Sequence, residues 1–144
     1  MFVCFRMKGV MDMDIKTMKR IAERETLRYR DNLAYMQGAL DAGGDYEQTR
    51  FYRCAAWVRA VQGAMAYFMR TDPAKAGFFT GYYHLDRPPT CRDSKRTMAA
   101  IAALFHVSES TLYHWRNEAL TVVVMAAIQT GALRPYDLND GKES

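Results

Sequence analysis

The sequence predicts an all-α fold, a helical bundle with a C-terminal helix-turn-helix and a long last helix. Apolar residues recur with a period near 3.6 along most of the chain, and no segment shows the strict alternation that is typical of strands. The segment from Thr97 to Asn117 also has the pattern of two helices joined by a tight turn. The 144 residues suit one domain, or one small domain with an appended helical part.

Residues 14–71 are expected to form an N-terminal helical hairpin, preceded by a leader over residues 1–13 for which disorder is one option. Asp14 can cap a helix whose apolar spacing continues to Leu40, before Gly43-Gly44 stops it. A second helix is expected from about Tyr46 to Met69. Its apolar face carries Ala55, Val58, Val61, Met65 and Phe68.

Residues 72–130 are expected to hold the helix-turn-helix region. Asp72-Pro73 ends the second helix and supplies a cap and a first position for a third helix. This third helix is rich in aromatic residues and runs from about Ala74 to Tyr83. The segment Arg87-Pro88-Pro89-Thr90 then breaks the helical pattern.

The turn itself has residue types that suit a helix-turn-helix. Two helices that cross closely need a small side chain in the middle of the first, and Ala102 lies there. His106 lies in the turn, where many such motifs have glycine, Val107 can point inward, and Ser108 can cap the next helix. An ordinary helical hairpin in an all-α core is the alternative interpretation. Four apolar residues are expected to close the small core: Ile101, Phe105, Leu112 and Trp115.

The last helix is expected to run on to about Gln129. From Leu120 to Ile128 it is apolar on nearly all sides, so it must be covered from several directions. The first two helices can supply part of the cover. The rest comes either from the same helix of a second subunit in a two-fold dimer or from the core of a monomer. Residues 131–144 are expected to form a flexible tail.

Composition excludes a membrane protein and suits a cytoplasmic one. No run approaches the roughly 20 apolar residues that a spanning helix needs. The three cysteines, Cys4, Cys54 and Cys91, cannot all pair within one chain and form no CxxC motif, which indicates reduced thiols. The net charge of +4 is mildly basic, which suits nucleic acid without requiring it.

Nothing in the sequence supports an enzyme, a metal site or a cofactor. The nucleotide-binding patterns GxxxxGK[ST] and GxGxxG, the nucleophile motif GxSxG and the metal motif HExxH do not occur. His84 and Cys91 flank a Pro-Pro loop and make a poor metal site. No catalytic residue is therefore predicted.

The proposed motif leaves one side of the last helix facing outward, where it can meet the base edges and phosphates of DNA. The outward residues are Ser108, Glu109, Ser110, Tyr113, His114 and Asn117. The net positive charge around this side is small, because residues 84–120 hold five Lys or Arg against four Asp or Glu. Because affinity for DNA comes mainly from neutralised phosphates, either a dimer supplies two copies or the basic N-terminal helices also contact the backbone.

The segment HVSESTLYHWRNEAL, from His106 to Leu120, resembles the end of the ArpU/RinA type of phage transcriptional regulators, which have a helix-turn-helix similar to region 4 of sigma-70 factors. A helix over Arg53 to Phe68 followed by FFTGYYHL matches that family's spacing further upstream. The resemblance covers about residues 53–133. It departs at His114, where the family often has Arg or Lys, and in a less basic helix before the turn. The matching motif positions are Val107, Ser108, Thr111, Leu112, Tyr113, Trp115, Ala119 and Leu120.

The resemblance implies a regulator that activates late, packaging or lysis genes of a phage or prophage by binding double-stranded DNA in the bacterial host cytoplasm. Ser108 and Ser110 are then expected to contact phosphate at the helix N-terminus, where the helix dipole favours an anion. Arg116, with Lys95 or Arg96, is expected to hold the DNA backbone.

The same resemblance implies base contacts. Tyr113, His114 and Asn117 are expected to read bases, since asparagine suits adenine and tyrosine can contact a thymine methyl group. Glu109 either accepts from a cytosine amine or serves as a capping charge.

Three other functions stay open. One is a small terminase-like DNA-packaging protein, which uses such a motif and assembles into rings. Another is a protein-interaction module whose helix-turn-helix binds RNA polymerase rather than DNA. The last, the DNA-binding part of a recombinase, is disfavoured because no catalytic serine or carboxylate cluster accompanies the motif.

Overall fold

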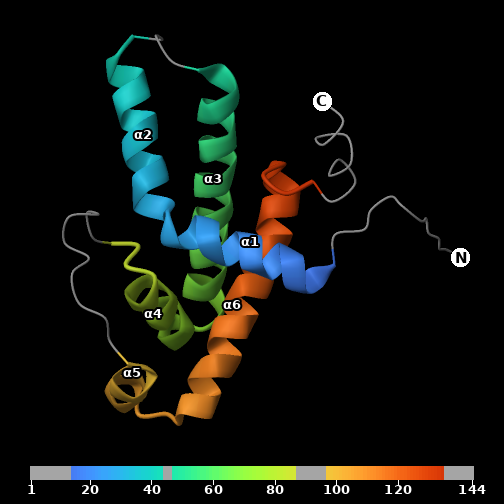
Figure 1. Ribbon diagram of the computed structural model, residues 1–144. Coiled ribbons are helices and arrows are strands. Elements are labelled where there is room, and N and C mark those ends of the chain that lie inside the picture. Colours follow the sequence, from blue (N-terminus) through green and yellow to red (C-terminus); the bar gives the residue numbers. More distant parts are fainter. Residues whose placement is uncertain (1–13, 44–46, 87–96, 135–144) are drawn as a thin grey trace, which may run out of the picture.

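The computed structural model describes residues 14–43, 47–86 and 97–134, and every regular element within them is a helix. The predicted all-α class, the C-terminal helix-turn-helix arrangement and the long last helix are confirmed. The expected leader over residues 1–13 lies outside the described residues, as do Lys95 and Arg96. The helices are α1 (Ile15–Leu27), α2 (Tyr29–Asp41), α3 (Gln48–Thr71), α4 (Pro73–Tyr82), α5 (Met98–Phe105) and α6 (Glu109–Thr130), as Figure 1 shows.

The first predicted helix does not run unbroken to Leu40. Helices α1 and α2 are separated at Arg28, whose backbone angles are φ −97° and ψ 12°. Just before it, Thr26 Oγ1 donates to the carbonyl of Ala22 over 2.7 Å, a type of hydrogen bond that often bends helices. The break lets α1 pack across α6 while α2 packs along α3. The expectation of one continuous helix was wrong.

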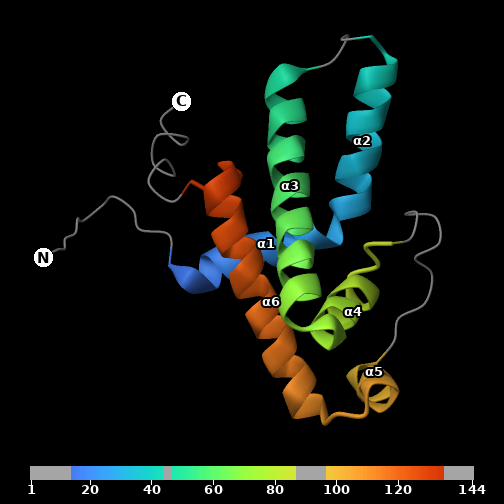
Figure 2. The same ribbon diagram turned by 180° about the vertical axis from the view of Figure 1, so that it is seen from behind.

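Helices α2 and α3 lie side by side as an antiparallel pair, and α1 crosses α3 and α6 on one side of the molecule (Figure 1). Seen from behind, α3 and α6 lie in front of α1 (Figure 2). The turn between α5 and α6 lies at one end of the molecule. The end of α2 and the start of α3 lie at the opposite end. The helix-turn-helix therefore lies at one end of the bundle, with α1 beside its last helix.

Side-chain caps start two helices where the sequence predicted them. Asp14 Oδ1 accepts from the backbone N–H of Thr17 over 2.8 Å at the start of α1. Asp72 Oδ1 accepts from the backbone N–H of Lys75 over 3.4 Å, and Pro73 lies in the first turn of α4. Both caps satisfy amides that have no partner within their helix.

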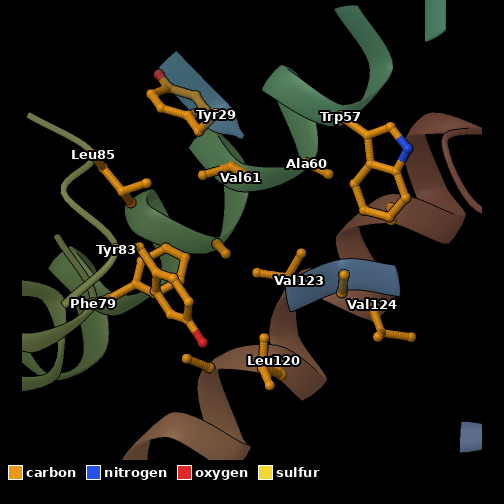
Figure 3. Packing of buried hydrophobic residues seen from close by; sticks show 14 of the residues in the cluster. Tyr29, Trp57, Ala60, Val61, Phe79, Tyr83, Leu85, Leu120, Val123 and Val124 are labelled. Atoms are coloured by element: carbon orange, nitrogen blue, oxygen red, sulfur yellow. The ribbon is translucent and has the colours of Figure 1, made fainter. Parts of the chain in front are cut away.

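One large cluster of buried side chains joins α1, α2, α3, α4 and α6 (Figure 3). Val61 from α3, Phe79 from α4 and Val123 from α6 are fully buried within it. The hydroxyl of Tyr29 points out of the cluster and accepts from Gln62 Nε2 over 3.1 Å. This cluster takes residues from both sides of the expected boundary between residues 71 and 72, so the hairpin and the helix-turn-helix region share one core.

The apolar stretch of α6 is covered largely from within the chain. Helices α1 and α3 pack against it, as expected of the first two predicted helices, and bury Val123 and Val124. Met125 and Ile128 are left 60% and 45% exposed. Helix α6 is thus a core helix of the chain, and the dimer stays a prediction.

The chain stays packed for a few residues after α6. Gly131 ends the helix at φ 84°, and the N–H of Leu133 donates to the carbonyl of Ala127 over 3.1 Å. The side chain of Leu133 belongs to the main buried cluster. Residues 131–134 of the expected tail thus pack against the bundle, the flexibility of the tail stays a prediction, and the rest of it lies outside the described residues.

Candidate nucleic-acid interface

The turn between α5 and α6 has the geometry that the sequence predicted. His106 ends α5 in the left-handed region, at φ 58° and ψ 42°, which is where glycine is ordinarily favoured. The N–H of Val107 then donates to the carbonyl of Ala102 over 3.1 Å. Ser108 Oγ accepts from the backbone N–H of Thr111 over 3.1 Å and caps α6. The chain therefore passes from α5 into α6 within three residues.

A separate small core holds the two helices of the motif together. Ala102 is 5% exposed where α5 meets α6, which fits the small side chain that a close crossing needs. The rings of Phe105 and Trp115 lie 6.1 Å apart, edge to face. Phe78 of α4 packs into the same cluster and fixes the motif to the bundle. The buried members of this cluster are Phe78, Ile101, Ala102 and Leu112.

The side of α6 that was predicted to face outward is exposed. Ser110, Tyr113, His114 and Asn117 are spaced by three and four residues, so they share one face of the helix. The tyrosine ring is 50% exposed. We call the following set the outward face; all its members are exposed: Ser108, Glu109, Ser110, Tyr113, His114 and Asn117.

Arg116 has a different environment from the one that the predicted phosphate contact requires. Its Nε and Nη2 atoms donate to the two carboxylate oxygens of Glu23 on α1, each over 3.1 Å. Tyr83, which follows α4, donates a third hydrogen bond to the same carboxylate over 3.2 Å. The hydrogen bonds that Arg116 donates to Glu23 raise the pKa of Arg116, and burial raises the pKa of Tyr83. Because this guanidinium is already paired, we assign Arg116 to positioning α1 against α6.

A second contact between α1 and α6 involves a member of the outward face. Lys19 Nζ donates to Asn117 Oδ1 over 2.9 Å, joining residues 98 positions apart in the chain. The amide of Asn117 is neutral, so this hydrogen bond leaves the lysine charge uncompensated. The contact places a cation directly beside the outward face.

An open groove of about 710 Å³ lies between α1 and the outward face, and we call it the α1–α6 groove. Three cationic side chains of α1 line it, whereas its one lining carboxylate is that of Glu23, which Arg116 neutralises. The groove is therefore basic where the sequence of α6 alone is close to neutral. Its lining residues are Lys16, Lys19, Arg20, Glu23, Ser110, Tyr113, His114, Arg116, Asn117 and Leu120.

No residue of α1 was predicted from the sequence as a contact, although a backbone contact by the N-terminal helices was left open. Lys16, Lys19 and Arg20 are spaced so that they lie on one face of a helix, and this spacing was the available signal. Which direction that face points depends on how α1 crosses α6, which local sequence does not show. The predicted contributions of Lys95 and Arg96 lie outside the described residues.

Other kinds of site are not evident in the described ranges. Within residues 14–43, 47–86 and 97–134, no three His, Cys, Asp or Glu side chains gather in a way that could hold a metal ion. None of the helices in the same ranges is both long and apolar enough to cross a bilayer. Cys54 is a buried free thiol whose Sγ lies 3.6 Å from Asn32 Oδ1.

No protein-family model, curated protein or solved structure matches the chain. The resemblance to phage transcriptional regulators thus rests on the motif residues between His106 and Leu120, while the outward face and the groove provide structural features that bear on function.

Proposed function

We propose that this chain is a sequence-specific DNA-binding protein that regulates transcription, activating late genes of a phage or prophage. The observation that carries the proposal is the exposed outward face of α6 beside a basic groove. An all-polar or aromatic face at the start of a helix, held by a tight turn, suits the major groove of double-stranded DNA. The cations of α1 supply the positive charge for phosphate contacts that α6 lacks.

The chemistry of the outward face suits base contacts in the first three turns of α6. His114 and Asn117 can each donate and accept hydrogen bonds, and the exposed ring of Tyr113 offers apolar area to a thymine methyl group. Ser108 and Ser110 lie at the N-terminus of α6, where phosphate contacts are favoured. The N-cap hydrogen bond of Ser108 holds that helix end in place.

A homodimer is part of the proposal. A monomer has one outward face and so reads one half-site, whereas a two-fold dimer reads two half-sites one helical turn apart. The side of α6 that α1 and α3 do not cover carries Met125 and Ile128. The mass in solution, measured by light scattering at several concentrations, separates a dimer from the ring that a terminase-like packaging protein forms.

A DNA-binding titration tests the proposal. The purified chain is titrated against duplex fragments of its own genomic neighbourhood at a series of salt concentrations. We expect one fragment to bind more tightly than the others. Replacing Asn117 or His114 by alanine should weaken binding by about 1–3 kcal/mol at one base position and relax the preference there.

Gln129→Ala provides the matched control, because it also removes an exposed polar side chain from α6 but does not line the groove. This variant should bind as the unchanged chain does. Failure of the folded chain to bind any duplex, even at low salt, contradicts the proposal.

Binding to RNA polymerase is the second candidate function. One observation favours it: Leu104 is 62% exposed and lines a small apolar pocket between α4 and α5 of about 180 Å³, together with Phe78 and Tyr82. Such a pocket suits an apolar side chain of a protein partner. Binding of purified bacterial RNA polymerase that Leu104→Asp abolishes, in a chain that binds no DNA, would favour this function over the first.

A further inference from the structure

The cationic residues of α1 face the same groove as the outward face of α6. Lys16, Lys19 and Arg20 share one side of α1 with Glu23, at spacings of three, four and seven residues. The contacts of Glu23 with Arg116 and of Lys19 with Asn117 show that this side points toward α6. The geometry therefore brings two helices, distant in sequence, to one surface.

The uncompensated positive charge of this surface comes from α1. Of the cations that line the groove, Lys16, Lys19 and Arg20 form no ion pair with a carboxylate in the part of the chain that the structure describes, whereas the charge of Arg116 is balanced by Glu23. Cations beside a base-reading helix favour phosphates over any neutral ligand, because neutralised phosphates supply most of the affinity for DNA.

We infer that α1 is a second DNA-contact element, in which Lys16, Lys19 and Arg20 bind phosphates of the backbone that flanks the groove read by α6. This inference rests on the proposed DNA-binding function and names the residues that supply its electrostatic part. Double-stranded DNA is the occupant, since the α1–α6 groove is open and runs beside a helix face suited to base edges.

Lys19 has a second role in this arrangement. In the free chain its Nζ donates to Asn117 Oδ1 over 2.9 Å. An asparagine that recognises adenine uses the same oxygen to accept from the base amine, while its nitrogen donates to the ring. Because this oxygen has two lone pairs, Lys19 can keep its hydrogen bond while the base amine donates to the second one. Lys19 then holds the asparagine in place while its charge lies next to a neighbouring phosphate.

Salt dependence of binding tests the inference on the full chain. The probe is a fluorescein-labelled duplex selected by the chain from a random pool, and the affinity is measured by anisotropy over a range of KCl concentrations. The logarithm of the affinity falls linearly with the logarithm of the salt concentration, with a slope of about −0.9 for each phosphate neutralised. Lys16→Gln, Lys19→Gln and Arg20→Gln should each reduce the size of the slope by about 0.9.

Arg59→Gln is the matched control, because Arg59 is an exposed cation on α3 that does not line the groove. It removes the same charge and should leave the slope unchanged. If the three α1 variants keep the slope of the unchanged chain, or if Arg59→Gln reduces it equally, the inference fails. Absence of any duplex binding by the unchanged chain instead removes the proposed function, so the two failures are distinguishable.

Two further comparisons separate the assigned roles. Asn117→Ala should lose the preference for one base while keeping the slope, whereas Lys19→Gln should lose slope while keeping the preference. Single-stranded DNA of the same length should bind more weakly and respond less to the α1 substitutions. Equal binding of both forms, with equal slopes, would make the groove a general polyanion site and overturn the assignment to duplex DNA.

Discussion

Arg116 on α6 donates two hydrogen bonds to the carboxylate of Glu23 on α1, from Nε to Oε2 and from Nη2 to Oε1, each over 3.1 Å. Paired geometry of this kind fixes orientation as well as distance, because a planar guanidinium meets a planar carboxylate. The two side chains are 32% and 25% exposed, so water screens the pair only in part. The contact sets how α1 lies against the outward face of α6.

The first prediction concerns the coupling of this pair. Glu23→Gln and Arg116→Gln should each lower the free energy of unfolding by about 1–3 kcal/mol, because each leaves a charged partner with fewer hydrogen bonds. The double variant should lose less than the sum of the two single losses. Urea unfolding of all four chains gives the coupling energy, and purely additive losses would show that the contact contributes nothing to stability.

A second prediction follows for DNA binding by the same variants. Arg116→Gln should weaken binding to all duplexes alike, because it loosens α1 from α6. Its salt slope should fall by much less than about 0.9, since α1 keeps its three cations and Arg116 is paired with Glu23 rather than with phosphate. Lys19→Gln provides the contrast, with its reduced slope. A slope that falls by about 0.9 in Arg116→Gln would instead support the phosphate contact by Arg116 that was expected from the sequence.

Stability at high pH is expected to depend on Tyr83. Burial and the nearby charge of Glu23 raise the pKa of this phenol above its ordinary value of 10.0. Tyrosine in the unfolded chain therefore loses its proton first, and its stabilising contribution, full below pH 10, is lost as the pH rises further. Tyr83→Phe should unfold with a shallower dependence on pH above this value, by up to about 1.4 kcal/mol per pH unit.

Urea unfolding between pH 9 and about 11 checks this expectation. Some pH dependence should remain, because the hydrogen bond to Glu118 also raises the pKa of Lys75. Tyr52→Phe is the control, since it removes a phenol that is 63% exposed on α3. Equal slopes in Tyr83→Phe and the unchanged chain would contradict the assignment.

The small core of the helix-turn-helix offers a matched pair of leucines. Leu112 is 0% exposed and Leu104 is 62% exposed, although both belong to the same motif. Leu112→Ala should cost about 2–5 kcal/mol because it leaves a cavity beside Ala102. Leu104→Ala should change stability by no more than about 0.5 kcal/mol. Thermal unfolding followed by circular dichroism compares the two, and similar losses would contradict the packing described for α5 and α6.

Local patterns predicted most of the fold. The cap at Ser108, the small residue at Ala102 and the start of α4 at Asp72-Pro73 depend on neighbours in sequence, so they could be inferred from residue types alone. The break at Arg28 could not, because no glycine or proline interrupts the helical pattern there. It arises from the different packing partners of α1 and α2.

The candidate site was predictable only on its α6 side. The spacing of Ser110, Tyr113, His114 and Asn117 identified an exposed face without knowledge of the rest of the chain. The approach of Lys19 to this face joins positions 98 residues apart, and no periodicity within one helix contains that information. Burial of Leu133 likewise depends on the main buried cluster, whose other residues come from helices distant in sequence.

The last prediction concerns backbone strain in the turn. His106 adopts φ 58° and ψ 42°, a left-handed conformation that costs a residue with a Cβ about 1–2 kcal/mol. Glycine avoids that cost but gives the unfolded chain more freedom, which offsets about 0.4–1 kcal/mol. His106→Gly should therefore stabilise the chain by up to about 1.6 kcal/mol, measured by urea unfolding. It should leave DNA binding unchanged, since His106 does not line the groove.

Two controls decide whether strain is the cause. His106→Ala removes the imidazole but keeps the Cβ, so it should not stabilise the chain. Gly131→Ala makes the opposite kind of substitution at the end of α6, because it adds a Cβ where φ is 84°. It should destabilise the chain by about 1 kcal/mol. Destabilisation by both His106→Gly and His106→Ala would show that contacts of the imidazole outweigh the strain, and the turn would then depend on this histidine rather than tolerate it.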